Sequence, residues 1–180
     1  MSVWGDAILH TMISFRAAVA MAGLGMVLGL VPATAQSPAT AKGEVGMHQI
    51  SGPFEVKMAP QKADNPQAEG AGLGRMSIDK QFHGALEATS QGEMLSVLDR
   101  EKGSGGYVAL ERVTGTVEGK TGSFVLQHNA TMNRGVPAMT IVVVPDSGTG
   151  ELTGISGSMT IRIEAGGKHF YDFEYSLETK

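Results

Sequence analysis

Two titratable side chains in this sequence lie on the same face of a predicted strand as apolar residues. His128 follows Phe124 and Leu126 at the two-residue spacing of a β-strand, and Glu111 follows Tyr107 in the same way. If these faces line the interior of the protein, His128 could act as a general base or hydrogen-bond a ligand. Glu111 could abstract a proton, because burial in apolar surroundings raises the pKa of a carboxyl group.

Both residues also have a purely structural interpretation. His128 can lie at the edge of the core with its ring bonded to a backbone carbonyl. Glu111 can point outward and pair with a basic residue of a neighbouring strand, such as Arg162 or Lys168. The choice depends on strand register, which the sequence does not determine.

Aromatic residues at strand spacing offer a second kind of site. Tyr171, Phe173 and Tyr175 form a stripe that is either packed core or a flat apolar wall with hydroxyl tips that orient a ligand. The candidate ligand-binding residues are therefore Tyr107, Glu111, His128, Tyr171 and Tyr175, and Glu111 and His128 are also the candidate catalytic residues.

Several kinds of chemistry are disfavoured by what the sequence lacks. It contains no cysteine, which excludes disulfides, thiolate zinc sites and cysteine nucleophiles. The histidines at 48, 83, 128 and 169 lack metal-ligand spacing, and no Gly-x-Ser-x-Gly motif is present. We expect no metal site and no cofactor.

The elements that must position these residues are strands. Apolar and polar residues alternate in "FEVKM" (54–58), "SMTIRIE" (158–164) and "YDFEYSL" (171–177), and no segment after residue 36 has the pattern of an amphipathic helix. Strands are predicted near 52–58, 74–83, 85–97 (bent or broken at Gly92), 106–117, 121–133, 138–145, 151–164 (interrupted by Gly154 and Gly157) and 168–178. With no helix to cover a sheet, the prediction is an all-β fold, a closed antiparallel β-barrel of about eight strands forming a single domain over 52–180.

A glycine motif occurs twice, as "TGTVEGKTGSFVLQH" (114–128) and "TGELTGISGSMTIRI" (149–163). In each copy we expect a strand to end at Thr-Gly, a reversal to follow, and a new strand to open at Gly-Ser. The predicted structural corners are Gly115, Gly119, Gly122, Gly150, Gly154 and Gly157. A phosphate-binding loop is disfavoured because no Lys-Ser/Thr pair and no helix follow the glycines.

The N-terminus has the features of a secretory signal peptide. An apolar, uncharged run (17–31) precedes Ala33 and Ala35, which predicts a signal peptide over 1–35 with cleavage between Ala35 and Gln36. The alternative, a membrane anchor, is disfavoured because about 20 apolar residues are needed to span a bilayer. We expect a secreted or periplasmic protein without membrane insertion of the mature chain, beginning with a disordered lead-in (36–51).

The charge balance bears on partners. The formal net charge is −4, with 14 basic and 18 acidic residues, which argues against nucleic acid as a partner. The run "MTIVVV" (139–144) is apolar on both faces, so a homodimer is a further expectation.

Four stretches resemble a bacterial domain-of-unknown-function family, family 3224. They are "GRMSIDKQFHGALEATSQGEML" (74–95), "YVALERVTGTVEGKTGSFVLQHNATMN" (107–133), "VVPDSGTGELTGISGSMTIRI" (143–163) and "GGKHFYDFEYSL" (166–177). The fold of that family is similar to the allene oxide cyclase barrel, so the resemblance implies an antiparallel barrel. It implies no activity.

Three functions remain open from the sequence. The leading hypothesis is an exported barrel that binds a small apolar molecule in its interior. The alternatives are a structural or oligomeric module with a solid core, and a cofactor-free isomerase or cyclase in which Glu111 or His128 moves a proton. Whether the protein is an enzyme is not determined by the sequence.

Overall fold

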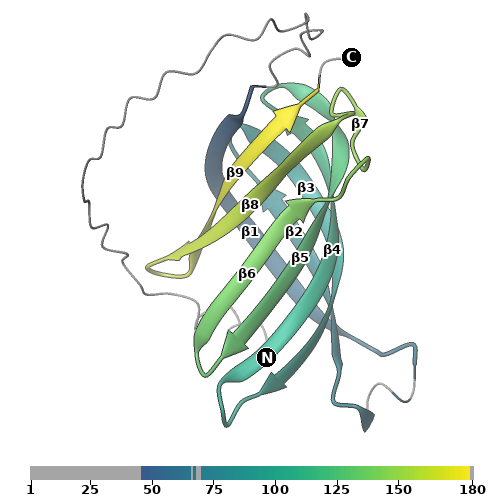
Figure 1. The fold of residues 1–180 in the computed structure, drawn as a ribbon, viewed down its shortest axis with the longest axis vertical. Helices are drawn as coiled ribbons and strands as arrows, with labels where there is room; N and C mark the ends of the chain where they lie inside the picture. Colours follow the sequence, from purple (N-terminus) through teal and green to yellow (C-terminus); the bar gives the residue numbers. More distant parts are fainter. Residues whose placement is uncertain (1–45, 66, 68–69, 179–180) are drawn as a thin grey trace, which may run out of the picture. The chain divides into compact units, whose positions relative to one another are not determined.

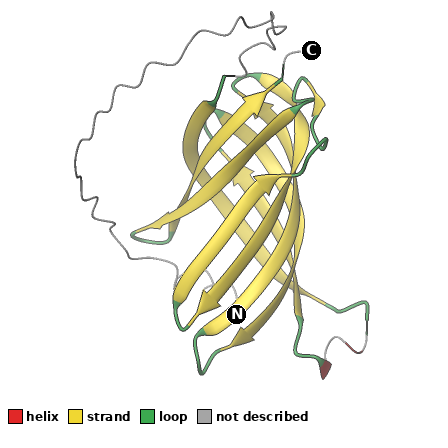
Figure 2. Ribbon diagram, in the orientation of Figure 1, coloured by secondary structure: helices red, strands yellow, loops and turns green. Residues whose placement is uncertain are grey.

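The protein is an antiparallel β-barrel of eight long strands, with a two-residue ninth strand paired beside them, in the computed structural model, which describes residues 46–65, 67 and 70–178 (Figures 1 and 2). The predicted signal peptide, its cleavage site at Ala35 and Gln36, and the lead-in up to residue 45 lie outside the described residues. Within the described part of the chain, no helix has the length and apolar character of a membrane span.

The strands follow one another around the barrel with short connections. Their bounds are β1 (His48–Gln61), β2 (Gly74–Phe82), β3 (Leu86–Asp99), β4 (Ser104–Val117), β5 (Lys120–Asn133), β6 (Val136–Val143), the short β7 (Thr149–Gly150), β8 (Ile155–Glu164) and β9 (Lys168–Leu177). The predicted all-β barrel is confirmed. β1 begins inside the expected lead-in. The predicted interruption at Gly154 is present, but residues 151–154 are all turn, and β8 then runs through Gly157 without a break.

The barrel closes through pairing of β1 with β9 and of β4 with β5, but one seam is short. β6 and β8 pair only at Ile141–Met159 and Val142–Ser158. Beyond these pairs the β5–β6 hairpin and the β8–β9 hairpin move apart (Figure 1). Pro137 lies on the part of β6 that lacks a partner in β8. Proline has no backbone N–H, so it weakens this edge as a template for a further strand.

The two ends of the barrel are packed differently. At the end with the β2–β3 and β4–β5 turns, which we call the sealed end, inward-facing residues such as Phe82, Leu86, Phe124 and Tyr171 are at most 1% exposed. At the opposite end, which we call the open end, several inward-facing side chains are only half-buried. They are Val56, Met58, Leu98, Tyr107, Met132, Met139, Ile161 and Ile163. Solvent therefore reaches the interior from one end.

The repeated glycine motif lies at the sealed end, where its two copies meet. Gly122 pairs with Gly150 across β5 and β7, and a Cβ on Gly122 would approach the Thr149 carbonyl oxygen to 2.1 Å. The corners are not identical, contrary to the expectation. In the first copy β4 runs past Thr114-Gly115 to Val117, and the reversal is a tight turn at Glu118 and Gly119, both with positive φ.

Candidate functional site

Four consecutive strands each contribute one polar residue to a single level of the barrel interior. These are Lys80 on β2, Ser90 on β3, Glu111 on β4 and His128 on β5, which we call the polar layer; none of them is more than 7% exposed. A further buried serine of β3, Ser96, lies nearer the open end. Successive residues of a strand point to opposite faces. Each member of the polar layer therefore faces inward, because the residues two positions before and after it face inward too.

The polar layer separates two apolar clusters. On β2, Lys80 follows Ile78, which belongs to a small cluster with Met76, Met94 and Ala109 toward the open end. It precedes Phe82, which belongs to the large core of the sealed end. The layer is therefore a polar level inside a largely apolar interior.

Glu111 is the centre of the layer. Lys80 Nζ donates to Glu111 Oε2 at 2.6 Å, and the Ser90 hydroxyl donates to Oε1. His128 Nε2 lies 2.9 Å from Oε2, but it is not aligned for a hydrogen bond and has no other hydrogen-bond partner among the described residues. One carboxylate therefore accepts hydrogen bonds from side chains of two strands and lies beside the His128 ring of a third.

Gly92 makes this arrangement possible. It is paired with Glu111 on the neighbouring strand, and a Cβ at this position would lie 2.5 Å from the Leu110 carbonyl oxygen and 2.9 Å from Glu111 Cα. The absence of a side chain lets the Glu111 side chain cross β3 and reach Lys80 on β2.

Lys80 has one oxygen partner and two aromatic ones. Its Nζ lies 5.4 Å from the centre of the Phe54 ring and 5.6 Å from that of Phe82. Cation–π contacts of this kind are strengthened when water is excluded. The ammonium group is thus held at the boundary between the polar layer and the sealed core.

The electrostatics keep Glu111 ionised. Burial acts to raise the pKa of the Glu111 carboxyl, but the Lys80 charge and the proximity of His128 outweigh it and lower the pKa to about 2. The expected raised pKa of Glu111 is therefore wrong. The Glu111 carboxylate is a weak base, since its conjugate acid is strong.

Tyr107 is the predicted tyrosine that lies at the open end. Its side chain is half-buried, and its hydroxyl lies 3.3 Å from Met139 Sδ, as a weak donor to sulfur. Burial, with the Glu111 charge, raises the pKa of Tyr107 to about 12. Tyr107 therefore remains a neutral hydroxyl near the polar layer.

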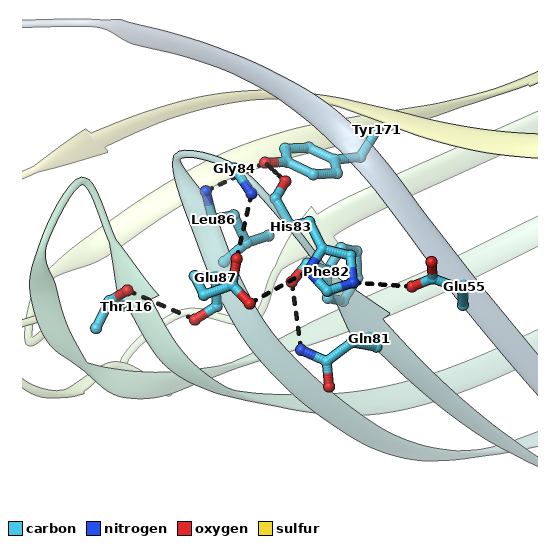
Figure 3. A network of polar contacts seen from close by, with 9 residues as sticks. All are labelled: Glu55, Gln81, Phe82, His83, Gly84, Leu86, Glu87, Thr116 and Tyr171. Carbon is cyan, nitrogen blue, oxygen red and sulfur yellow. Dashed lines mark hydrogen bonds and ion pairs between the residues drawn. The ribbon is translucent and has the colours of Figure 1, made fainter.

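Tyr171 and Tyr175 lie in the core of the sealed end instead. The Tyr171 hydroxyl donates to the His83 carbonyl and accepts from the Leu86 N–H, both at 3.1 Å, which closes the β2–β3 turn (Figure 3). The Tyr175 hydroxyl donates to Glu118, and its ring stacks on that of Phe173. Both hydroxyls have structural partners, and the predicted aromatic stripe of Tyr171, Phe173 and Tyr175 is packed core of the sealed end.

The structure brings three of the five predicted residues together: Tyr107, Glu111 and His128. Glu111 points inward and pairs with Lys80, not with Arg162 or Lys168. Lys80 and Ser90 were not predicted as site residues, although Lys80 lies on the same strand face as the apolar residues Ile78 and Phe82. A lysine at that position is a signal that sequence reasoning could use. Among the described residues, no three His, Cys, Asp or Glu side chains gather as metal ligands.

Comparison with known proteins identifies the family. The model of the family described as "Protein of unknown function (DUF3224)" matches residues 50–175, which include every strand that contributes to the polar layer. The chain belongs to the DUF3224 family. A solved structure of a DUF3224 protein of unknown function from Shewanella oneidensis MR-1 is 48% identical, with a TM-score of 0.67. The match covers 74% of this chain and 100% of that one. The comparison with curated proteins found no match.

Proposed function

We propose that this DUF3224 barrel binds a small, largely apolar molecule at its open end, with the polar layer holding the polar group of the ligand. The observation that carries the proposal is a buried Lys80–Glu111–His128 cluster placed beneath an end of the barrel whose inward-facing side chains are partly exposed.

The cluster is hard to explain by stability alone. Desolvating two charges costs several kcal/mol, and apolar residues of similar size would often serve a core as well or better. The layer also has unused hydrogen-bonding capacity. Lys80 has three donors and one oxygen acceptor among the described residues, and His128 Nε2 is buried without a hydrogen bond. A ligand that offers a carbonyl or hydroxyl oxygen would satisfy these groups.

The side chains above the layer suit a ligand of variable shape. Met58, Met132 and Met139 face inward at the open end, and methionine adapts to irregular partners because its side chain is unbranched and polarizable. A small cleft at this end is lined by residues that include Leu98, Tyr107 and Met132. Movement of these methionines would enlarge it without disturbing the sealed core.

Binding is favoured over proton-transfer catalysis. A carboxyl group with a pKa of about 2 is a poor base at neutral pH, so Glu111 is better suited to hold Lys80 and His128 in place than to abstract a proton. A cofactor-free isomerase would need another base, and the inward-facing groups near Glu111 offer only His128 for that role.

The experiment is native mass spectrometry of the protein purified from its own cells, compared with its denatured mass. A bound mass that disappears on denaturation is expected for the natural protein. His128→Gln should lose that mass, whereas His83→Gln, which changes a histidine that is outside the barrel interior, should keep it. Met132→Trp, which fills the open end without altering the layer, provides a second test if His128→Gln does not fold. Absence of any bound mass in the natural protein, together with no binding of apolar carbonyl or hydroxyl probes, would contradict the proposal.

We also propose that the protein acts outside the cytoplasm. The support is the sequence itself: the apolar run over 17–31, followed by Ala33 and Ala35. N-terminal sequencing of protein from the cell envelope should find Gln36 as the first residue. Recovery of the uncleaved chain from the cytoplasm would contradict export and would leave the ligand proposal unaffected.

A further inference from the structure

A hollow of about 770 Å³ lies on the outside of the barrel, beside the connection that joins β1 to β2 at the open end (Figure 1). Its floor is the outer face of β3, β4 and β5. Its side wall is formed by described residues of the connection and by Arg75 at the start of β2. A volume of this size is within the range of small-molecule binding sites. We call this feature the outer hollow.

Four aliphatic side chains give the outer hollow an apolar lining. Leu95, Val108 and Leu110 lie on the floor and Leu73 on the wall, and each is between 47% and 57% exposed. Leu95 is paired with Val108, and Leu110 is two residues further along the same face of β4, so the three floor side chains are neighbours. Contiguous apolar surface marks a binding site more often than a single exposed leucine does. An aliphatic chain laid on this floor would be removed from water together with these side chains.

Arg75 joins the wall of the outer hollow to its floor. Its Nε donates to Glu93 Oε2 on β3 at 2.8 Å, and its Nη2 lies 2.6 Å from the same oxygen. Its Nη1 donates to Asp64 Oδ2 on the connection. The Arg75 side chain is only 23% exposed, so its guanidinium lies between the two carboxylates rather than in open solvent. The wall is therefore held by a charged bridge of three side chains.

The charged bridge leaves hydrogen-bond acceptors free at the rim of the outer hollow. All three guanidinium nitrogens of Arg75 face a carboxylate, whereas Glu93 Oε1 and Asp64 Oδ1 accept no hydrogen bond from any described residue. The bridge carries two negative charges and one positive charge, so one negative charge is in excess. Both carboxylates are more than half exposed and can be reached by a ligand. A group that donates hydrogen bonds and carries a positive charge is complementary to them.

Two other basic side chains lie near the outer hollow along the chain, but neither lines it. Lys62 is on the same connection, and Arg112 is on β4 beyond Leu110. Arg112 Nη1 donates instead to the Ser123 hydroxyl at 3.3 Å, on β5 toward the sealed end. The excess negative charge at the rim is thus not neutralised by any ion pair of the described residues.

We propose that the outer hollow binds a small amphiphilic cation, of which an aliphatic amine is the simplest form. The ammonium group donates to the free oxygens of Glu93 and Asp64. The aliphatic chain lies across Leu95, Val108 and Leu110. This site is on the outside of the barrel and is independent of the interior site proposed above.

The arrangement of the bridge disfavours other occupants. An anionic ligand would have to compete with two carboxylates for the guanidinium of Arg75, and it would be repelled by both. A second barrel could not lay a flat sheet face on the floor, because the connection stands beside the floor as a wall.

Titration of the purified protein with three eight-carbon probes, followed by methyl NMR, tests the site. The probes are octylammonium, octanoate and 1-octanol, which share an alkyl chain and differ in charge. The Leu95, Val108 and Leu110 methyl signals should shift with octylammonium, and this probe should bind about three- to fivefold more tightly than octanol and still more tightly than octanoate. The preference should diminish at about 1 M salt, because the carboxylates are exposed. Shifts confined to inward-facing methyl groups such as that of Ile78, or equal affinity for all three probes, would overturn the proposal.

Two variants and a matched control separate the charge from the apolar floor. Glu93→Gln leaves the bridge without excess charge, so the preference for octylammonium over octanol should vanish. Leu110→Gln should weaken octylammonium binding by about fivefold, because it removes apolar surface from the floor. Val136→Gln changes a side chain that is 69% exposed at the start of β6, outside the outer hollow, so both affinity and preference should be retained.

Two results with these variants would contradict the site. Equal weakening by Leu110→Gln and Val136→Gln would show that the probe does not contact the floor. A natural protein that is a dimer in sedimentation velocity and becomes a monomer with Leu110→Gln would show that another copy, and not a small cation, covers the floor.

Discussion

The two ends of the barrel are made from the same alternating strands and nevertheless differ in character. At the sealed end the inward positions carry Phe82, Phe124 and Tyr171, which fill the interior, and the polar groups of the turns are bonded. At the open end they carry Met132 and Met139, which leave it partly exposed. The alternation thus sets which residues face inward, and side-chain size and shape decide whether the interior is filled.

The connections between strands reinforce this difference. Tyr171 and Tyr175 hold the turns of the sealed end through hydrogen bonds from their hydroxyls. The β6–β8 seam, in contrast, has two residue pairs and then separates toward the open end. We infer that the sealed end supplies most of the stability, whereas the open end can change its packing at low cost.

The largest expected effect comes from breaking the ion pair at the boundary of the two ends. Glu111→Gln leaves the Lys80 ammonium buried without a countercharge, so the free energy of unfolding should fall by about 3–5 kcal/mol in urea denaturation. The double variant Lys80→Met with Glu111→Gln should recover most of this loss, because no charge then remains unpaired.

An exposed ion pair provides the control for that experiment. Arg162 donates to Asp172 at 2.6 Å on the outside of β8 and β9, and Arg162→Gln should cost less than about 1 kcal/mol. If the double variant were as unstable as Glu111→Gln, the loss would come from packing and not from the unpaired charge.

The second effect is a pH dependence that originates in the polar layer. The pKa of Glu111 is lowered from an ordinary value of 4.5 to about 2, so the folded state binds the proton less readily than the unfolded state does. Its contribution to stability is therefore complete above about pH 4.5 and is lost as the pH falls toward 2, on the order of 3 kcal/mol in total. The difference in unfolding free energy between the natural protein and the Lys80→Met, Glu111→Gln double variant should shift by this amount over that range. A difference that is constant with pH would show that Glu111 is not held ionised.

Much of the fold could be predicted from the sequence, because period-two alternation is a local property. The strands over 158–164 and 171–177 follow directly from it and are present within β8 and β9. The strand predicted over 151–164 was expected to be interrupted at Gly154 and at Gly157. The chain does turn at Gly154, whereas β8 continues through Gly157. Strand propensity does not reveal which glycines bend the chain and which make room for a neighbour.

The site was less predictable because it depends on contacts between strands. His128 and Glu111 could be found from their apolar neighbours, but the partner of Glu111 lies two strands away on β2, beyond Gly92. The sign of the pKa shift of Glu111 depends on that partner: burial alone would raise the pKa, and Lys80 reverses the direction. The pairing register of the strands determines which side chains meet across them, and register cannot be read from a single sequence.

The smallest effect separates the two ends most directly, by removing one hydroxyl from each. Tyr171→Phe leaves the Leu86 N–H and the His83 carbonyl without the partner that joins them, so unfolding should become easier by about 1–3 kcal/mol. Tyr107→Phe removes only a weak contact with Met139 Sδ in a half-buried position, and we expect a loss below about 1 kcal/mol. Thermal unfolding of both variants measures the stability, and native mass spectrometry measures the retained ligand. We expect opposite orders in the two assays: Tyr171→Phe should be the less stable protein and keep the ligand, whereas Tyr107→Phe should be nearly as stable as the natural protein and bind the ligand less well. If Tyr107→Phe retained the ligand fully while Tyr171→Phe lost it, the binding site would lie at the sealed end, and the assignment of stability to one end and ligand binding to the other would be wrong.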